Sequence, residues 1–487
     1  MQPTTDDSPQ APGVELTQLQ TVAQCHEVIA SLRQVVTHQQ QQLAELQQQI
    51  AWLQERLKLD SKTSSKPPSS DGPGSGNRAQ RRASGRKRGA QKGHAGSYRA
   101  LLEEAQVDQV IDCPVAEVCE CGAAVHIESD FIRHQVFDAP VVQAQVSEYR
   151  LHAGCCTACG KRHRARLPAG VPSGQIGPRA LALVGVLGTH YHLTQMKARD
   201  LLAEVLGVDF SVGAISQAHG KVALALKEPL REVAAQVRQA PVKHIDETGY
   251  PREGGANWAW AVVTPKLVHY SLLPTRARYA ATSLIGEQPT GNVVSDRYAV
   301  YDYVDAHRRQ ICWSHLLRDF TRISQRAGLA GRIGRGLLGA GYVLFRWRAQ
   351  DRSTARFEPL CRRVRRLLEQ GSAQRHCTRT ARTCANVLRL WPALWTFLHN
   401  PDVPPTNNDA ERALRAIVLK RKISGPTRSR RGDEFIARGF SAYETCRRQG
   451  RNLWHYLHEA VVAWIDKTTP PSLLPAITVT AVAAPSG

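Results

Sequence analysis

The chain has 487 residues, which is long enough for two or three domains with a substantial core. Lysine and arginine outnumber aspartate and glutamate by 64 to 42, so the formal net charge is +22. A merely well-solvated surface mixes the two signs more evenly, so this excess points to nucleic acid, with an anionic membrane surface as the weaker alternative. The polar, acidic first residues argue against a signal peptide, and no apolar run approaches the roughly 18 residues of a membrane-spanning helix.

Residues 14–59 predict a coiled coil. Apolar residues recur at spacings of three and four over about five heptads. Ten of the eleven seam positions are apolar and one is glutamine: Val22, Cys25, Ile29, Leu32, Val36, Gln39, Leu43, Leu46, Ile50, Leu53 and Leu57. We expect this seam to pair with a second copy of the chain and form a homo-oligomer. A helical hairpin within one chain is the alternative.

Residues 60–99 predict a disordered linker, because a Ser/Pro/Gly-rich stretch that turns into a Lys/Arg run cannot bury enough apolar surface to fold alone. Its basic part, from Arg78 to Lys92, can follow the phosphates of DNA. We expect DNA contacts from the centre of this run: Arg86, Lys87 and Arg88.

The segment 100–168 predicts a small zinc-binding β module. One cysteine pair is a C-x-x-C followed by glycine, the tight turn that brings two thiolates onto one zinc ion, and the other is a C-x-C, one residue shorter than usual. Twelve cysteines in a chain without an export signal favour a reducing compartment, where thiols bind metals. We expect one structural Zn²⁺ on Cys119, Cys121, Cys156 and Cys159. Cys113 and Cys155 are alternative ligands, and six free thiols in a small domain are the alternative to a metal site.

The remaining chain predicts a helical region followed by a mixed sheet with further helices. Residues 173–240 read as helices, and a turn before Ser211, a candidate N-cap, has the layout of a DNA-binding helix-turn-helix. Short strands and a hairpin follow within 241–440, interrupted by Arg-rich helices at about 320–400. A helical element is expected at 441–467 and a disordered tail at 468–487. The fold class is therefore multidomain α/β.

Two acids follow short apolar strands, Asp246 in HIDETGY and Asp296 in SDRYAVY. Because the ends of neighbouring strands can lie side by side, we expect the two carboxylates at one edge of the sheet. Hard divalent cations, above all Mg²⁺, favour such oxygen ligands. A third carboxylate would complete a two-metal site for in-line phosphoryl displacement.

Glu411 is the candidate third acid, and its position permits two interpretations. With Asn408 as N-cap and Glu411 three residues on, the pattern matches a capping box. The 3/4 spacing also places Glu411 on the same face as Leu414 and Ile417, at the head of the apolar stripe, where a metal ligand could stand. The pattern alone does not favour either interpretation.

Six motifs occur here in the order seen in transposases of the insertion-sequence 66 family: TSSKPPSSDG, GAQKGHAG, HIDETGY, SDRYAVY, CWSHLLRDF and PTNNDAERALR. The chain resembles that family over about residues 20–465. The resemblance implies a DDE transposase with a ribonuclease-H-like core, in which Asp246, Asp296 and Glu411 are the catalytic acids and Mg²⁺ or Mn²⁺ is the cofactor. The helices at 320–400 then resemble the insertion that some such cores carry. The short C-x-C pair departs from the family pattern, which puts the identity of the zinc ligands in doubt.

The resemblance also implies the partners and the setting. We expect a bacterial cytoplasmic, nucleoid-associated protein that binds the terminal repeats of its element, target DNA and accessory proteins. Basic residues after Glu411 can compensate the phosphates near the acids; those expected to bind DNA are Arg412, Arg415, Lys420, Arg421, Lys422, Arg428 and Arg430. A related nuclease that only cuts and a non-catalytic DNA-binding regulator are the competing functions.

Overall fold

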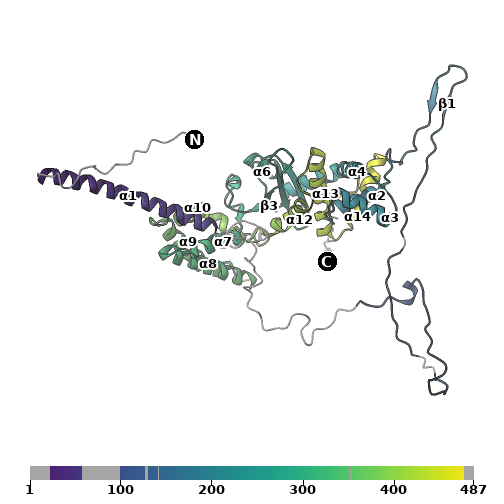
Figure 1. Ribbon diagram of the computed structural model, residues 1–487, viewed down its shortest axis with the longest axis horizontal. Helices are drawn as coiled ribbons and strands as arrows, with labels where there is room; N and C mark the ends of the chain where they lie inside the picture. Colours follow the sequence, from purple (N-terminus) through teal and green to yellow (C-terminus); the bar gives the residue numbers. More distant parts are fainter. Residues whose placement is uncertain (1–21, 58–98, 127–129, 141, 351–352, 476–487) are drawn as a thin grey trace, which may run out of the picture. The chain divides into compact units, whose positions relative to one another are not determined.

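The computed structural model describes residues 22–57, 99–126, 130–140, 142–350 and 353–475 (Figure 1). The chain divides into two compact units. The first comprises 1–75, 168–194 and 216–487, and the second comprises 76–167 and 195–215. The predicted basic linker, with Arg86, Lys87 and Arg88, lies outside the described residues except for its last one.

A five-stranded mixed sheet forms the centre of the first unit. Its strand order is β5-β4-β3-β6-β7. Strand β4 pairs antiparallel with both β3 and β5, and β6 pairs parallel with both β3 and β7. The predicted hairpin and the mixed α/β class are thereby confirmed. The strands are β3 (Val242–Gly249), β4 (Trp258–Val263), β5 (Val268–Leu273), β6 (Asn292–Ser295) and β7 (Arg309–Ile311).

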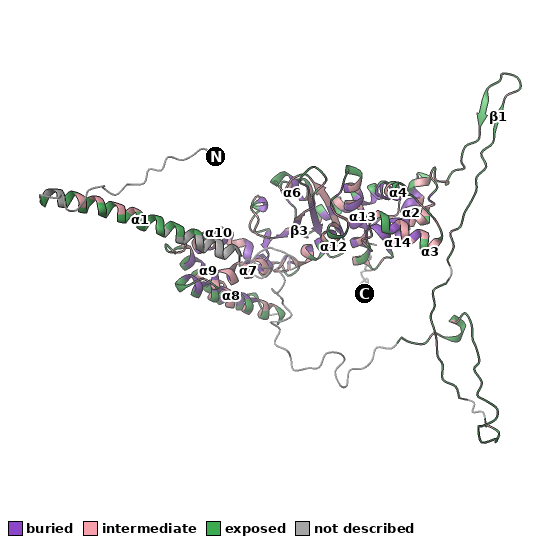
Figure 2. Ribbon diagram, viewed as in Figure 1, coloured by how far each residue is buried: buried purple, intermediate pink, exposed green. Residues whose placement is uncertain are grey.

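Helices cover this sheet and bury its apolar strands (Figure 2). Helix α12 packs on β3 and β4, whereas α5 and α13 pack on the edge strand β5. Hydroxyl groups of α13 satisfy that edge: the amide of Tyr270 donates to Ser441 Oγ at 2.8 Å and the amide of Val268 to Thr445 Oγ1 at 3.1 Å. An edge covered in this way does not template pairing with another strand. The helices are α5 (Lys227–Gln239), α6 (Arg278–Ile285), α12 (Asn408–Ser424) and α13 (Arg430–Gln449).

The C-terminal boundaries differ from those predicted. Helix α13 runs straight through the predicted end of the core at residue 440, because its second half supplies the hydroxyl groups that cover β5. Helix α14 (Leu453–Asp466) then packs against α2 (Pro178–Gly188). The predicted disorder from residue 468 is wrong as far as residue 475: Leu473 is fully buried, and its carbonyl accepts from Gln449 Nε2 at 2.8 Å. Residues 476–487 lie outside the described part.

The predicted Arg-rich helices are present between β7 and α12, and we call α8–α11 the helical insertion. They share one core with α7, to which Trp313, Leu337, Val364 and Trp395 contribute. A Cβ at Gly334 would lie 2.3 Å from the backbone nitrogen of Ser324, so glycine permits the close crossing of α7 and α8. The helices are α7 (Trp313–Ser324), α8 (Gly328–Ala349), α9 (Glu358–Ser372), α10 (Thr378–Arg389) and α11 (Thr396–His399).

The second unit contains little regular structure. Strands β1 (Ala153–Cys155) and β2 (Arg162–Arg164) form an antiparallel pair around the second cysteine pair. Residues 131–152 alternate apolar and polar side chains, a pattern that predicts strands, but the residues described there form none. Ile132 is 97% exposed and Val146 87% exposed, so the described residues leave the apolar face that alternation predicts largely uncovered. Helix α3 (Gln195–Leu206) completes this unit.

Two further predictions concern single helices. Residues 22–57 of the expected coiled coil form one uninterrupted helix, α1 (Val22–Leu57). After α3, the chain turns and enters α4 (Val212–Ala225), where Ser211 Oγ accepts from the amide of Ala214 at 3.1 Å and so is the predicted N-cap. None of the described helices has the length and apolar character needed to span a membrane.

Candidate active site

The three predicted acids stand on neighbouring elements. Asp246 belongs to β3, Asp296 directly follows β6, and Glu411 lies in the first turn of α12. Strands β3 and β6 pair in parallel, and α12 packs on β3. The backbone orients two of these carboxylates: Asp246 Oδ1 accepts from the amide of Glu247 at 2.9 Å, and Asp296 Oδ1 from the amide of Tyr298 at 2.9 Å.

Asp246 lies within its strand and not after it, which corrects the sequence prediction. The parallel pairing of β3 with β6 ends at His244, but the antiparallel pairing with β4 continues to Gly249. Asp246 therefore stands two residues beyond the last pair with β6, where that side of β3 is no longer covered by a strand. This position still brings its carboxylate toward the residue that follows β6.

The capping-box interpretation of Glu411 is wrong. The N-cap of α12 is Asn407 and not Asn408, and its side chain makes no capping hydrogen bond. The buried Asn407 side chain is engaged elsewhere, because its Nδ2 donates to the carbonyl of Ile245 at 2.9 Å and its Oδ1 lies 3.1 Å from His244 Nδ1. These bonds tie the start of α12 to β3. They leave Glu411 without a capping role.

The carboxylates are close enough to act on one another electrostatically. The pKa of Asp246 is raised well above its usual value, first by burial and then by the negative charges of Glu247, Asp296 and Glu411. Oxygen Oε1 of Glu411 is buried without a hydrogen-bond partner. Among the described residues, no group of three or more ligand-type side chains close enough to hold one ion contains Asp246 or Asp296. A divalent cation shared by the three acids is therefore a prediction, based on the preference of such ions for carboxylate oxygens.

Glu411 also faces two basic side chains of α7. Its Oε1 lies 3.4 Å from His315 Nδ1 and 3.6 Å from an Nη of Arg318. Among the described residues, Cys312, His315 and Glu411 form a group whose ligand-type atoms all lie within 4.8 Å of one another. Burial raises the pKa of the Cys312 thiol to about 11, and its sulfur accepts from the amide of Asn407 at 3.1 Å. Cys312 is thus a buried thiol at the N-cap of α7, and His315 lies beside Glu411.

The loop that carries Asp296 is held by one buried arginine. Arg309, 1% exposed, donates to the carbonyls of Asp296 at 2.9 Å and Tyr298 at 3.3 Å. It also donates to Ser295 Oγ at 3.1 Å and to Asp302 at 2.8 Å. Sequence reasoning missed this residue. The available signal was a charged residue inside a three-residue strand that is otherwise buried.

Comparison with known proteins decides the family. The model described as "Transposase IS66 family" matches residues 173–434, which is more than half of the chain and includes all three acids. The chain belongs to the IS66 transposase family. The resemblance seen in the motifs is thereby confirmed. Residues 14–100 match a family of unknown function.

A curated relative of this IS66-family chain is the uncharacterized protein y4jO of Sinorhizobium fredii. It is 40% identical over 73 residues, which are 15% of this chain and 23% of the relative. The chain therefore covers less than a quarter of the relative's length.

Other acids near the motifs of this IS66-family chain are engaged by arginines. Asp409, two residues before Glu411, pairs with Arg448 at 3.1 Å and Arg412 at 3.0 Å. Glu434 lies 3.3 Å from Arg430. Of these three acids, the one whose charge is named among the causes that raise the pKa of Asp246 is Glu411.

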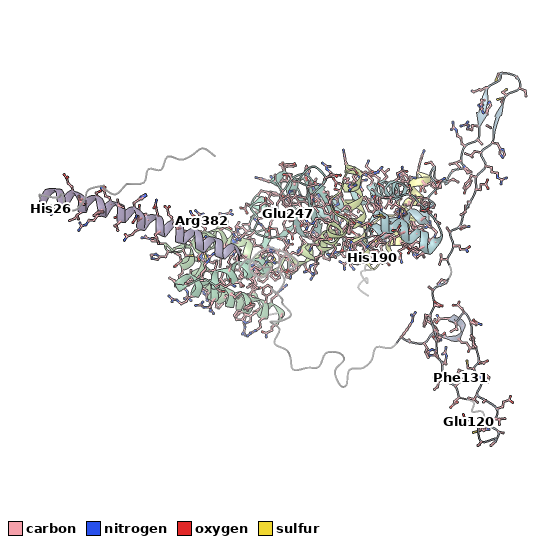
Figure 3. The ribbon with its side chains drawn as sticks, viewed as in Figure 1. His26, Glu120, Phe131, His190, Glu247 and Arg382 are labelled. Atoms are coloured by element: carbon pink, nitrogen blue, oxygen red, sulfur yellow. The ribbon has the colours of Figure 1, made fainter. Side chains whose placement is uncertain are left out.

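Glu247, the acid next to Asp246, has a fully buried side chain. It pairs with Arg276 at 2.6 Å and accepts from the hydroxyl of Tyr301. Burial raises its pKa and so does the charge of Asp296, whereas Arg276 and Tyr301 offset the shift. The Arg276 guanidinium lies 4.0 Å from the ring centroid of Tyr298, which further fixes this group. Figure 3 labels Glu247 within the sheet.

The basic residues expected to bind DNA separate into two groups. Lys420 is a correction: it is buried, donates to the carbonyl of Leu193 at 2.6 Å, and has its pKa lowered by burial to about 8. Arg421 is half-buried and donates to the carbonyl of Gly249. Both therefore stabilise the fold. The exposed members of the predicted set are Arg412, Arg415, Lys422, Arg428 and Arg430.

The four predicted zinc ligands form two local pairs. Tight turns hold each pair, with Gly122 at φ 88° and Gly160 at φ 69°. Hydrogen bonds from Cys121, chiefly from its backbone, lower the pKa of Cys119. Hydrogen bonds from Cys159, again chiefly from its backbone, lower the pKa of Cys156. No group of three or more ligand-type side chains in the described residues contains any of these cysteines. One shared ion remains a prediction.

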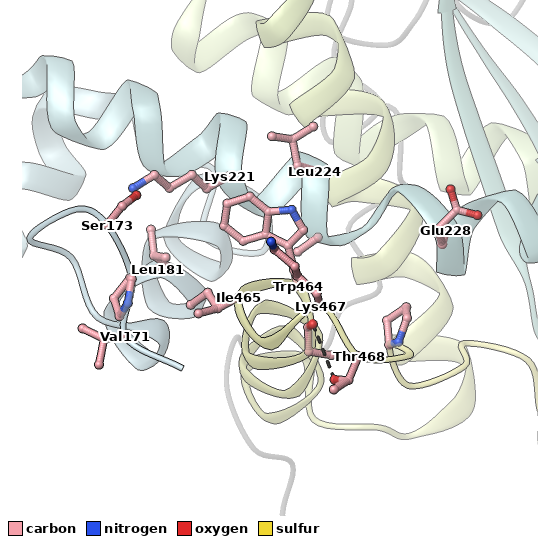
Figure 4. Close-up of a pocket in the computed structure, with 14 residues that line it drawn as sticks. Val171, Ser173, Leu181, Lys221, Leu224, Glu228, Trp464, Ile465, Lys467 and Thr468 are labelled. Atoms are coloured by element: carbon pink, nitrogen blue, oxygen red, sulfur yellow. Dashed lines mark hydrogen bonds between the residues drawn. The ribbon is translucent and has the colours of Figure 1, made fainter. Parts of the chain in front are cut away.

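A cavity of about 580 Å³ lies elsewhere in the first unit, between α2, α4 and the end of α14 (Figure 4). Its walls are largely apolar, with Lys221, Glu228 and Lys467 at their edges. None of the three candidate catalytic acids lines it. It is not part of the site described above.

Proposed function

We propose that this chain is a DNA transposase that binds the ends of its element, cuts a DNA strand there, and joins the freed 3′-OH to target DNA by a DDE two-metal mechanism. The observation that supports this proposal is that Asp246, Asp296 and Glu411 stand on neighbouring elements of an IS66-family chain, where the charges of the latter two raise the pKa of Asp246. We further assign the core to the ribonuclease-H-like fold, supported by the strand order β5-β4-β3-β6-β7.

In this proposal, the three carboxylates would hold Mg²⁺ or Mn²⁺, which would supply a nucleophilic water at neutral pH and charge compensation for the attacked phosphate. The chain's own residues set the geometry. Arg309 and the amide of Tyr298 fix Asp296, Asn407 fixes the start of α12 on β3, and His315 and Arg318 limit where Glu411 can move. Exposed arginines that follow Glu411 would receive the DNA backbone.

Two further assignments accompany the activity. We assign one structural Zn²⁺ to Cys119, Cys121, Cys156 and Cys159, supported by their two tight turns. We also assign a coiled-coil homo-oligomer to α1, since seam residues such as Leu43 and Leu46 are 57% and 56% exposed in one chain. Sedimentation should give an oligomer that deletion of residues 1–60 weakens, and a monomer at micromolar concentration would contradict the coiled coil.

The test of the activity is incubation of the full-length protein with a labelled end fragment, unlabelled target DNA and Mg²⁺. A nicked fragment and a joined product are the expected results. A nick without joining would indicate a nuclease that only cuts. Binding of the end fragment without either product would favour the DNA-binding regulator.

A further inference from the structure

Helix α7 leads away from Glu411 with two distinct faces. One face is buried and carries Trp313, Leu316, Phe320 and Ile323. The other carries His315, Arg318 and Arg322 at spacings of three and four, so these side chains line one stripe. An Nη of Arg318 lies 3.6 Å from Oε1 of Glu411, and Arg322 continues the stripe one turn further along α7.

The stripe continues onto the helical insertion through the residue next to Asp296. Arg297 donates from Nη2 to Asp319 of α7 at 2.7 Å and from Nη1 to Asn386 of α10 at 2.5 Å. Asp319 also pairs with Arg322. One guanidinium therefore connects the Asp296 loop, α7 and α10.

Helix α10 presents a matching face. Arg382, Asn386 and Arg389 are four and three residues apart, and they lie on one side of the helix, because Cys384 and Val387 face its core. Arg389 pairs with Asp302, at the far end of the Asp296 loop, at 2.7 Å. Arg382 is exposed and extends the row beyond the loop.

The composition of the insertion indicates what binds this row. Residues 320–400 contain sixteen arginines, no lysine and three acids, Asp351, Glu358 and Glu369. A general solvating surface uses lysine as readily as arginine, whereas the planar guanidinium matches phosphate in a two-pronged geometry. The row starts beside the acids, and its arginines outnumber Asp319 and Asp302, the two aspartates that pair with them. It therefore suits a polymer of phosphates.

We propose that Arg318, Arg322, Arg382 and Arg389 form a track for the sugar–phosphate backbone of DNA immediately next to the phosphate that is cut. The proposal rests on the proposed function, since it takes the substrate to be DNA. It adds a binding surface on α7 and α10, distinct from the basic residues that follow Glu411. Because Arg297 and Arg389 also hold the Asp296 loop, DNA on this track lies against the groups that fix Asp296.

The test measures the salt dependence of binding to the end duplex, in buffer without divalent cations so that no cleavage occurs. Arg382→Ala should make the slope of log K against log salt shallower by about 1, the value for one lost phosphate contact. Arg322→Ala combined with Arg382→Ala should change it by about 2. The matched control is Arg362→Ala on α9, an arginine with a 71% exposed side chain whose partner is Glu358, and its slope should equal that of the unmodified protein.

A second measurement locates the contact. The duplex is shortened close to the cut, on each side in turn, and the effect of Arg382→Ala should disappear with one of the two shortened duplexes. An unchanged slope for Arg382→Ala, an equal change for Arg362→Ala, or an effect that persists on both shortened duplexes would each overturn the track. If the unmodified protein does not bind the end duplex at all, the proposed function fails. If it binds and cleaves while Arg382→Ala behaves as the control does, only this inference fails.

Discussion

Candidate metal ligands occur in two places: where β3 extends beyond β6, which we call the sheet edge, and in the cysteine-bearing segment. The surroundings of these two sets of side chains are opposite. At the sheet edge, Asp246, Glu247 and Arg309 are held by strands, helices and buried hydrogen bonds. In the described part of residues 99–167, no residue is buried. The protein core positions the first set of ligands. The second set has no core to do so, and small domains without one depend on a metal or a partner to fold.

Zinc removal should therefore have the largest effect on the cysteine segment. Structural zinc contributes about 10–16 kcal/mol of binding free energy at pH 7 in small zinc modules, so Cys156→Ser should leave residues 99–167 unfolded. Metal analysis and limited proteolysis measure this, with Cys361→Ser in the helical insertion as the control. If protein purified under reducing conditions contains no bound zinc, the four cysteines do not form a structural zinc site. If zinc survives Cys119→Ser, then Cys113 or Cys155 is the ligand.

Glu411→Gln should have the largest effect on activity at the sheet edge. The change removes a charge from the carboxylate cluster and keeps the shape of the side chain. Losing a metal ligand should cost several kcal/mol of transition-state stabilisation, which reduces the rate of cleavage by about 10³-fold or more. Binding of end DNA should persist. Gel assays of nicking and joining decide the matter, with Asp409→Asn compared in parallel. A rate within about tenfold of the unmodified protein would transfer the role of third acid to Asp409 or Glu434.

Asn407→Ala should show that buried hydrogen bonds hold the sheet-edge ligands. The variant leaves the carbonyl of Ile245 and the ring of His244 without their partner, and unsatisfied buried groups cost about 1–3 kcal/mol each. We expect the free energy of unfolding to fall by about 2–4 kcal/mol, together with slower cleavage. Denaturant titration measures the first effect. The control is Asn408→Ala, which is half-buried, and an equal loss there would show that Asn407 has no special role.

Lys420 gives the smallest effect and tests the electrostatics of the same core. Burial lowers its pKa from 10.5 to about 8, so between these pH values the unfolded chain keeps a proton that the folded chain has released. The free energy of unfolding of the unmodified protein, relative to that of Lys420→Met, should then rise with pH through this window by on the order of 2 kcal/mol. Thermal unfolding from pH 7 to pH 10 measures the difference. Parallel curves for the two proteins would contradict the lowered pKa.

The sequence predicted what periodicity and motifs encode. Alternation predicted the β4–β5 hairpin, and 3/4 spacing predicted the long helix α1. Motif resemblance singled out Asp246, Asp296 and Glu411, which the fold brings to neighbouring elements.

What the sequence did not predict depends on contacts between distant residues. Asn408 with Glu411 has the pattern of a capping box, but the neighbouring Asn407 is bound to β3, 162 residues earlier in the chain. Alternation at 131–152 predicts strands, but apolar side chains there, such as Ile132 and Val146, remain exposed in the part of the chain that the structure describes. Arg309 is a single charged residue without a period, and only the tertiary structure shows the carbonyls that it binds.

The four hydrogen-bonding partners of Arg309 bear on how tightly the site can bind a cation. A ligand loop that must become ordered on binding subtracts its lost conformational entropy from the affinity, about 1–2 kcal/mol for each backbone residue that is fixed. The loop from Ser295 to Asp302 is already fixed by the side chain of a neighbouring strand. Pre-organisation of this kind means that Arg309→Lys, which cannot reach all four acceptors, should weaken Mg²⁺ binding while leaving every carboxylate ligand in the chain.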